Sequence, residues 1–376
     1  MFKQIQKYGA YIFLLNNILF SFYGFYEIGT NIFLILTSLF LIITLLNPVF
    51  IKNIIFNRSF NVYYSFILIN ITYYLFFDFG DFESFKFLSA RTVQFLLFIS
   101  TIYFTHETFK LELIKILKIT CVSCVGLSLV FNFPDLNERY YGVFFNPNEF
   151  SIIMVYGFSL FVFKKSKSLF DFFIIFLFVF LILLSGSRAA LLGVFISLFL
   201  NFKFSRITIF SSFSLILFIY FFRDLPAVFR FFNEDLFYNR KFEMIYAFDT
   251  FYNEFWTGNG LKNYAYIDEK VISSFDNKID FGAHNGYLSI LVQYGFIFSL
   301  AYFFVFIKYT YRAIKYLRLK MKSDSNYKFY FFVIIYTLVN SLFENSLTGI
   351  NFFQGSLFWL VLGFVCYDLN NKKIEQ

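Results

Sequence analysis

The chain has 376 residues, of which 59% are hydrophobic and 15% are charged. No soluble domain can bury so large an apolar fraction, so the composition excludes a soluble enzyme and predicts an integral membrane protein. The formal net charge is +8. We attribute this charge to loops that follow membrane topology, and we expect no nucleic-acid partner.

Apolar runs that are long enough to cross a bilayer, which takes about 20 residues per helix, recur along the whole sequence. We therefore predict an all-α integral membrane protein with about 12 transmembrane helices. The predicted spans are 9–26, 28–46, 60–77, 87–104, 113–131, 148–163, 168–184, 188–202, 205–222, 284–307, 328–344 and 352–368. Residues 1–131 form an N-terminal group of these helices.

The distribution of basic residues predicts how the helices are oriented. Lysine and arginine gather in alternate connections, such as 164–167 and 312–322. By the positive-inside rule these connections are cytoplasmic, and so are both termini. The one long polar segment, 223–283, then forms a large extracytoplasmic loop.

Two short polar segments lie on the same side as this loop. The first, 134–149, contains Arg139 and a turn that ends at Asn148 and starts a span. The second is Ser185-Gly186-Ser187-Arg188, where the glycine permits a tight reversal and the second serine can cap the next helix.

Arginines near the outer ends of two spans are candidates for binding an anion. Arg188 falls in the first turn of a helix, where the dipole does not favour a cation but free amides and a guanidinium can together hold a phosphate. The alternative is an interfacial arginine that extends to lipid phosphates. The same two interpretations apply to Arg91, one turn inside the fourth span. Glu344 either faces the same region or caps the loop that follows it.

The long loop predicts one helix and one turn. Residues 239–248, which include Arg240, alternate polar and apolar side chains at helical spacing, as in an amphipathic helix on a membrane surface. Gly258 and Gly260 mark a tight turn and not a nucleotide-binding loop, because no strand precedes them.

His284 is one of two histidines in the chain and opens the span that follows the long loop. A titratable imidazole at the mouth of a span is well placed to act on a lipid-linked substrate. A lone histidine there can also be a helix-capping or interfacial residue. The sequence has no acidic motif for a divalent ion and no nucleotide-sugar fold, so we predict neither a metal nor a cofactor.

Four motifs resemble, in order and spacing, those of the O-antigen polymerase and O-antigen ligase superfamily. They are 141–150 (YGVFFNPNEF), 183–192 (LLSGSRAALL), Arg240 with 256–264 (WTGNGLKNY), and 283–288 (AHNGYL) with Gln293-Tyr294-Gly295. The resemblance covers residues 139–310, and 132–376 then form a polymerase/ligase-like core that includes the loop 223–283. The turn reads Trp-Thr-Gly-Asn-Gly where the family usually has proline and an aliphatic residue.

The resemblance implies a metal-independent, inverting glycosyltransferase of GT-C-like fold in the bacterial cytoplasmic membrane, with its active site facing the periplasm or exterior. Donor and acceptor would be oligosaccharides on undecaprenyl diphosphate, and a chain-length regulator is a candidate partner. His284 would be the catalytic base, and Arg188, Arg139 and Arg240 would hold the diphosphate. Further candidates for substrate contacts are Asn285, Asn148, Arg91 and Tyr264.

Three functions remain open at this point. We favour a polymerase of O-antigen or capsule repeat units over a ligase that moves glycan to lipid A-core or protein, although both share the donor chemistry. The third is a flippase of lipid-linked glycan. Transporters more often have internal duplication and charges near the midplane, whereas this chain concentrates its polar residues on one face. That concentration favours an enzyme.

Overall fold

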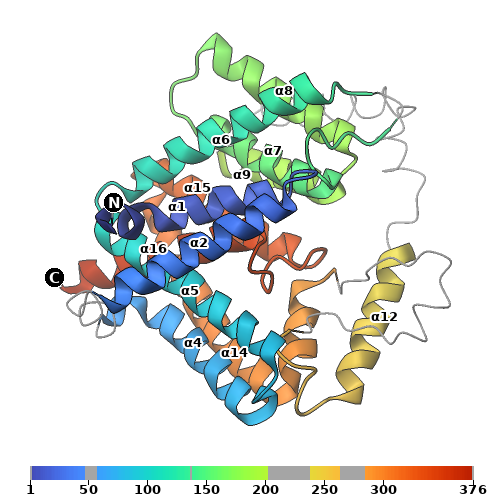
Figure 1. Ribbon diagram of the computed structural model, residues 1–376. Coiled ribbons are helices and arrows are strands. Elements are labelled where there is room, and N and C mark those ends of the chain that lie inside the picture. Colours follow the sequence, from blue (N-terminus) through green and yellow to red (C-terminus); the bar gives the residue numbers. More distant parts are fainter. Residues whose placement is uncertain (1, 47–56, 136–137, 202–237, 263–283, 375–376) are drawn as a thin grey trace.

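The computed structural model describes residues 2–46, 57–135, 138–201, 238–262 and 284–374 (Figure 1). The regular secondary structure of these residues is helical, and β structure among them is limited to an isolated bridge between Phe22 and Phe144. Five of the described helices are long and apolar enough to cross a bilayer, and three shorter helices are also apolar. The predicted all-helical, multi-pass membrane protein is therefore confirmed for the described part.

The helices overlap the predicted spans, but some bounds differ. In chain order they are α1 (Phe2–Phe20), α2 (Tyr26–Leu45), η1 (Arg58–Phe60), α4 (Asn61–Tyr73), η2 (Tyr74–Asp78), α5 (Phe82–Thr105), α6 (Phe109–Phe131), α7 (Pro147–Val162), α8 (Leu169–Ser185), α9 (Arg188–Asn201), α12 (Tyr238–Asn253), α14 (Gly286–Lys320), α15 (Asn326–Asn340) and α16 (Phe353–Ile374). The helix that begins at Gly286 continues to Lys320, past the predicted end of its span at 307, so residues 312–320 are helical and do not form a connection. The predicted span 205–222 lies outside the described residues. The total of about 12 crossings stays a prediction.

The first helix ends earlier than the predicted span 9–26. α1 stops at Phe20, and a turn through Gly24 (φ 78°) leads to α2. Aromatic residues make this turn nearly as apolar as a helix, so hydropathy alone does not show where the helix ends. The backbone of the turn instead bonds to the segment before α7: Tyr23 N donates to Val143 O at 3.0 Å. The N-terminal helices are thus joined directly to the polar segment that carries Arg139.

The helices are grouped around α15 and α16. Figure 1 shows α6, α7, α8 and α9 together at one end of the molecule and α4, α5 and α14 together at the other. Almost every described side chain of α7 is buried, and so are those of α16 up to Tyr367. Helices that are apolar all round are expected in the interior of a bundle.

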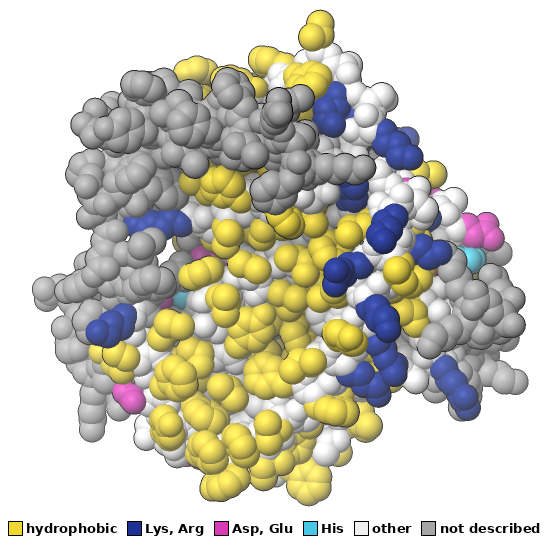
Figure 2. All heavy atoms as spheres, turned by 180° about the vertical axis from the view of Figure 1, so that it is seen from behind, with side chains coloured by type: hydrophobic (Ala, Val, Ile, Leu, Met, Phe, Trp, Pro, Cys, Tyr) yellow, Lys and Arg dark blue, Asp and Glu magenta, His cyan; other side chains and the backbone are white. Residues whose placement is uncertain are grey.

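The surface has a broad apolar face. Figure 2 shows this face with lysine and arginine side chains gathered along one edge. Soluble monomers rarely expose a contiguous apolar area of this kind, whereas lipid hydrocarbon covers it. The basic edge agrees with the positive-inside pattern, and the orientation itself stays a prediction.

α14 is interrupted at Gly295 (φ 62°, ψ −174°), which corrects the prediction of one continuous span over 284–307. The predicted glycine turn docks at this interruption. Gly260 N donates to Gln293 O at 3.2 Å. A Cβ on Gly258 would lie 2.4 Å from Gly295 N, and a Cβ on Gly295 would lie 2.5 Å from Gly258 N. Both positions have positive φ and such close backbone contact that only glycine fits.

The docked turn holds α12 against α14. Ala247 and Phe251 of α12 form a small buried cluster with Leu288 and Val292 of α14. The predicted helix at 239–248 is confirmed as part of α12, which packs on α14 through Ala247 and Phe251. Its predicted position on the membrane surface stays a prediction. The packing on α14 brings one polar residue of α12, Glu243, to the start of α14.

Candidate active site at the start of α14

The backbone at His284 is held in an unusual conformation. His284 has φ of 37°, and no other non-glycine residue in the described ranges has a positive φ. Next to it, Asn285 Oδ1 caps α14 by accepting from Tyr287 N at 3.0 Å and Leu288 N at 3.1 Å. Asn285 N in turn donates to Asn345 Oδ1 at 3.1 Å. Strained backbone persists where the surroundings fix it, and it concentrates at functional sites.

Two carboxylates flank the imidazole ring of His284. Nδ1 lies 3.2 Å from Glu344 Oε2, and Nε2 lies 3.8 Å from Glu243 Oε1. Both glutamate side chains are more deeply buried than the histidine, whose side chain is 35% exposed. An ionised Glu344 can only accept, so this hydrogen bond requires the proton on Nδ1, and Nε2 keeps a lone pair only while the ring is neutral.

The other oxygen of Glu344 connects this pair to α7. Asn148 Nδ2 donates to Glu344 Oε1 at 3.2 Å. Arg139 Nη2 then donates to Asn148 Oδ1 at 3.0 Å. A chain of side-chain hydrogen bonds therefore runs from His284 through Glu344 and Asn148 to Arg139. The predicted base and one predicted arginine belong to one connected arrangement.

Arg139 also connects to the turn that precedes Arg188. Its Nε donates to Ser185 O at 2.9 Å, at the end of α8. Gly186 adopts φ of 63°, and Ser187 Oγ accepts from Ala190 N at 3.4 Å, so the predicted reversal and cap are confirmed. Arg188 begins α9 directly after this turn. The turn that precedes Arg188 is therefore bonded to Arg139, and through Arg139 to the chain of hydrogen bonds that ends at His284.

The remaining candidates lie elsewhere or outside the described side chains. Arg240 is in the first turn of α12, three residues before Glu243, but its side chain is not among those described. Tyr264 lies outside the described residues. Their proposed contacts with substrate stay predictions.

One interpretation of the sequence expected Arg91 to extend to the lipid surface. The structure does not place it there. It is 5% exposed and lies near the rings of Phe87 and Phe95. It donates to Gln94 Oε1 at 2.8 Å and to the carbonyl of Thr348. Thr348 belongs to the loop between α15 and α16, which also carries Glu344. Arg91 therefore fastens this loop from α5.

The sequence did not fully predict two residues of the site. Glu243 was not recognised, and Glu344 was left with two alternatives. The signal for Glu243 is a carboxylate on the apolar side of an amphipathic helix, where it is 9% exposed. Within the described part of the chain, no cluster of three or more His, Cys, Asp or Glu side chains is suited to a metal ion.

One comparison with known proteins bears on this site. Residues 173–304 match a family model described as O-antigen ligase. The match includes Arg188, α12 and His284, while Arg139, Asn148 and Glu344 come from the flanking segments. No curated protein matches the chain. The similarity to O-antigen ligases is confined to residues 173–304, which are about a third of the chain.

Proposed function

We propose that this protein is an inverting glycosyltransferase that polymerises lipid-linked repeat units of O-antigen or capsule. It would act at the outer face of the bacterial cytoplasmic membrane, with undecaprenyl-diphosphate-linked oligosaccharides as donor and acceptor. One observation carries the proposal: a chain of hydrogen bonds joins His284, the proposed base, to Arg139, a proposed phosphate-binding group, and His284 lies in the segment similar to O-antigen ligases.

His284 acts as the general base in this mechanism. Its Nε2 accepts the proton of the acceptor hydroxyl while that oxygen attacks the anomeric carbon of the donor. The new glycosidic bond forms as the bond to the diphosphate breaks, and the diphosphate leaves with the electron pair. Glu344 keeps the ring in the required tautomer, and Glu243 and Glu344 together stabilise the imidazolium.

Arginines offset the charge of the leaving diphosphate. Arg188, Arg139 and Arg240 provide guanidinium groups, which match phosphate oxygens in a planar, bidentate geometry. Two donors of Arg139 already bind Ser185 O and Asn148, so the plane of its guanidinium is fixed before substrate arrives. Such preorganised charge lowers the barrier without a metal ion.

The test uses the purified full chain in lipid nanodiscs with a synthetic lipid-linked repeat unit. A polymerase yields lipid-linked products of two and more repeats, which mass spectrometry resolves. His284→Ala should lower this activity by about 100-fold or more. His106→Ala is the matched control, because this other histidine lies at the end of α5, edge-on to Tyr367, and its loss should leave the rate unchanged.

A ligase is the second candidate, and the description of the matched family model favours it. The same preparation distinguishes the two when lipid A-core is supplied as acceptor together with preformed lipid-linked polymer. Transfer to the core without chain growth indicates a ligase and rejects the polymerase. Full activity of His284→Ala in either assay rejects the proposed base.

A flippase makes a different prediction in cells. Lipid-linked repeat units would stay on the inner leaflet in a strain carrying Arg188→Ala. A polymerase with the same substitution would instead leave single repeat units at the outer surface, with no ladder of longer chains.

A further inference from the structure

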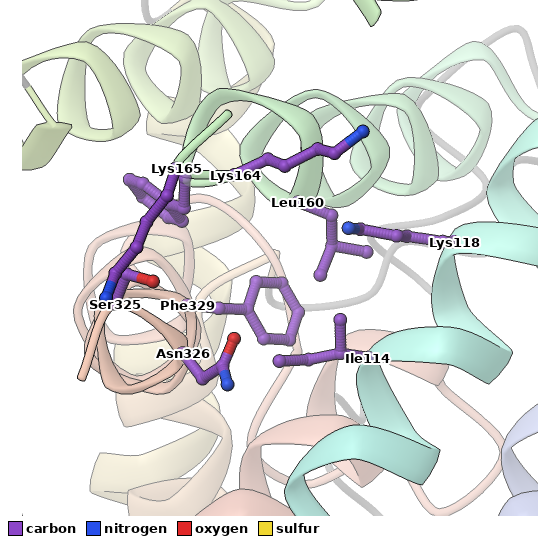
Figure 3. A pocket seen from close by; sticks show the side chains of 9 residues that line it. Ile114, Lys118, Leu160, Lys164, Lys165, Ser325, Asn326 and Phe329 are labelled. Atoms are coloured by element: carbon purple, nitrogen blue, oxygen red, sulfur yellow. The ribbon is translucent and has the colours of Figure 1, made fainter. Parts of the chain in front are cut away.

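A pocket lies at the opposite end of α7 and α15 from His284 (Figure 3). α7 begins beside the active site at Pro147 and ends at Val162, and α15 runs the other way, from Asn326 at the pocket to Asn340. At 1.5 Å per residue a helix of this length covers roughly 24 Å. The pocket is therefore separated from His284 by most of a hydrocarbon layer, which is about 30 Å thick.

The pocket combines an apolar lining with a cationic one. Its volume is about 230 Å³, whereas roughly 10–15 Å³ admits a single water molecule. Apolar side chains from α6, α7, α15 and the residue after α7 line one part. Lysines, together with a serine and an asparagine, line the other. The lining residues are Ile114, Leu160, Phe163, Phe329, Lys118, Lys164, Lys165, Ser325 and Asn326.

The three lysines come from two separate segments. Lys118 belongs to α6, and Lys164 and Lys165 follow the end of α7. Figure 3 shows the side chains of Lys118 and Lys164 extending toward one another. Like charges are brought together here at the wall of a cavity, where Lys118 and Lys164 are partly buried and Lys165 is exposed.

Acidic groups offset only part of this charge. Asp171 pairs with Lys164, with 2.7 Å between Oδ2 and Nζ, and Asp324 of the neighbouring connection pairs with Lys110 at 3.5 Å. Lys118 lies over the ring of Phe161 at 5.6 Å. In the described part of the chain, neither Lys118 nor Lys165 has a salt bridge.

The start of α15 adds to the positive potential. Ser325 and Asn326, at the N-terminus of this 15-residue helix, line the pocket. A helix N-terminus attracts negative charge through its dipole. A free anion would use this potential but not the apolar wall, and an uncharged lipid would use the wall but not the lysines.

We propose that the pocket binds an anionic phospholipid, with the phosphate between Lys118 and Lys165 and the start of an acyl chain beside Ile114, the apolar lining residue that is only partly buried. An amphiphile with a phosphate group satisfies both parts of the lining. Basic pockets between membrane helices bind lipid headgroups in this way. The proposal does not depend on the reaction at His284.

Native mass spectrometry of the delipidated full chain tests the proposal, with phosphatidylglycerol and phosphatidylcholine titrated separately. The wild-type protein should bind phosphatidylglycerol about tenfold or more tightly than phosphatidylcholine. Lys118→Gln combined with Lys165→Gln should weaken phosphatidylglycerol binding by about 30-fold, or about fivefold for each lysine. The charge-preserving pair Lys118→Arg and Lys165→Arg should retain the affinity.

A matched control removes the same charge elsewhere on the basic edge. Lys315 and Lys322 are exposed and lie outside the pocket, so Lys315→Gln combined with Lys322→Gln should change the affinity less than twofold. Equal losses in the two glutamine pairs overturn the site, since they indicate general attraction to the basic edge. Unchanged binding in the pocket variant also overturns it. Displacement of phosphatidylglycerol by an equal concentration of inorganic phosphate overturns the assignment to a lipid.

Discussion

Polar residues are arranged differently at the two ends of α7. At the Asn148 end, side chains of unlike charge and polarity are joined by hydrogen bonds into one chain from His284 to Arg139. At the Val162 end, lysines of like charge surround a cavity with an apolar wall. The first arrangement fixes directions, which catalysis requires, and the second provides charge and volume, which binding requires. Substitutions should therefore affect reaction rate at one end, and stability or lipid binding at the other.

The largest effect on rate, apart from loss of His284, should come from Glu344→Gln. The glutamine amide can donate to Nδ1, which favours the wrong tautomer and leaves no lone pair on Nε2. We expect the rate of chain elongation to fall about 100- to 1000-fold with unchanged thermal stability. Glu243→Gln is the comparison, and it should cost less because the contact to Nε2 is 3.8 Å long. Equal losses in the two variants would remove the special role of Glu344.

Arg188→Ala should follow, with a loss of about 100-fold in the same assay, because one guanidinium proposed to hold the leaving diphosphate disappears. Arg188→Lys should recover only part of the rate, since an ammonium group cannot form the planar, bidentate contact. Complete recovery by lysine would show that only charge matters at this position. Loss of the protein from the membrane in both variants would assign Arg188 to folding.

The contrast between the two ends was only partly visible in the sequence. Apolar length located the helices, because crossing a bilayer imposes it, and the capping chemistry of Ser187 was recognisable locally. The partners of His284 were not, since Glu344 lies 60 residues away along the chain. Glu243 was overlooked because the amphipathic helix was expected on a membrane surface, where a carboxylate is solvated. The local sequence around Arg91 does not indicate its bond to the carbonyl of Thr348.

The interruption of α14 could not be predicted from the sequence, for a related reason. Residues 284–307 form a continuous apolar run, and Gly295 acquires its role only through the docked turn. Gly258→Ala should push this turn away through contacts of 2.4 Å with Gly295 N and Gln293 O, and so displace Glu243 from His284. We expect a lower melting temperature and about a tenfold lower rate, measured on the same preparation. Gly126→Ala in α6 is the control, because its Cβ would meet nothing within 4 Å. A normal rate in Gly258→Ala would separate the docking from catalysis.

At the other end of α7, Asp171→Ala should affect stability and not rate. Asp171 accepts from Ser168 N at 2.6 Å in the capping box of α8 and pairs with Lys164. Loss of the bond from Ser168 N, one half of this capping box, should cost about 1 kcal/mol of unfolding free energy, while chain elongation continues normally. The same variant leaves Lys164 without this carboxylate, so phosphatidylglycerol should bind more tightly than to wild type. A loss of elongation activity would contradict the division between the two ends.

The smallest effect should come from an exposed ion pair that belongs to neither end of α7. Lys262, after the glycine turn, lies 2.6 Å from Asp81 and lowers the pKa of that carboxyl, while Asp81 raises the pKa of Lys262. The contribution of Asp81 to stability is present above its ordinary pKa of 3.8 and is lost as pH falls through the lowered value. The contribution of Lys262 is present below 10.5 and is lost as pH rises through the raised value. Asp81→Asn should therefore lower the melting temperature slightly at pH 7, and the difference from wild type should shrink in high salt and at acidic pH. A difference that persists in high salt would contradict a role through charge, because asparagine can still accept the bond from Glu83 N that caps α5.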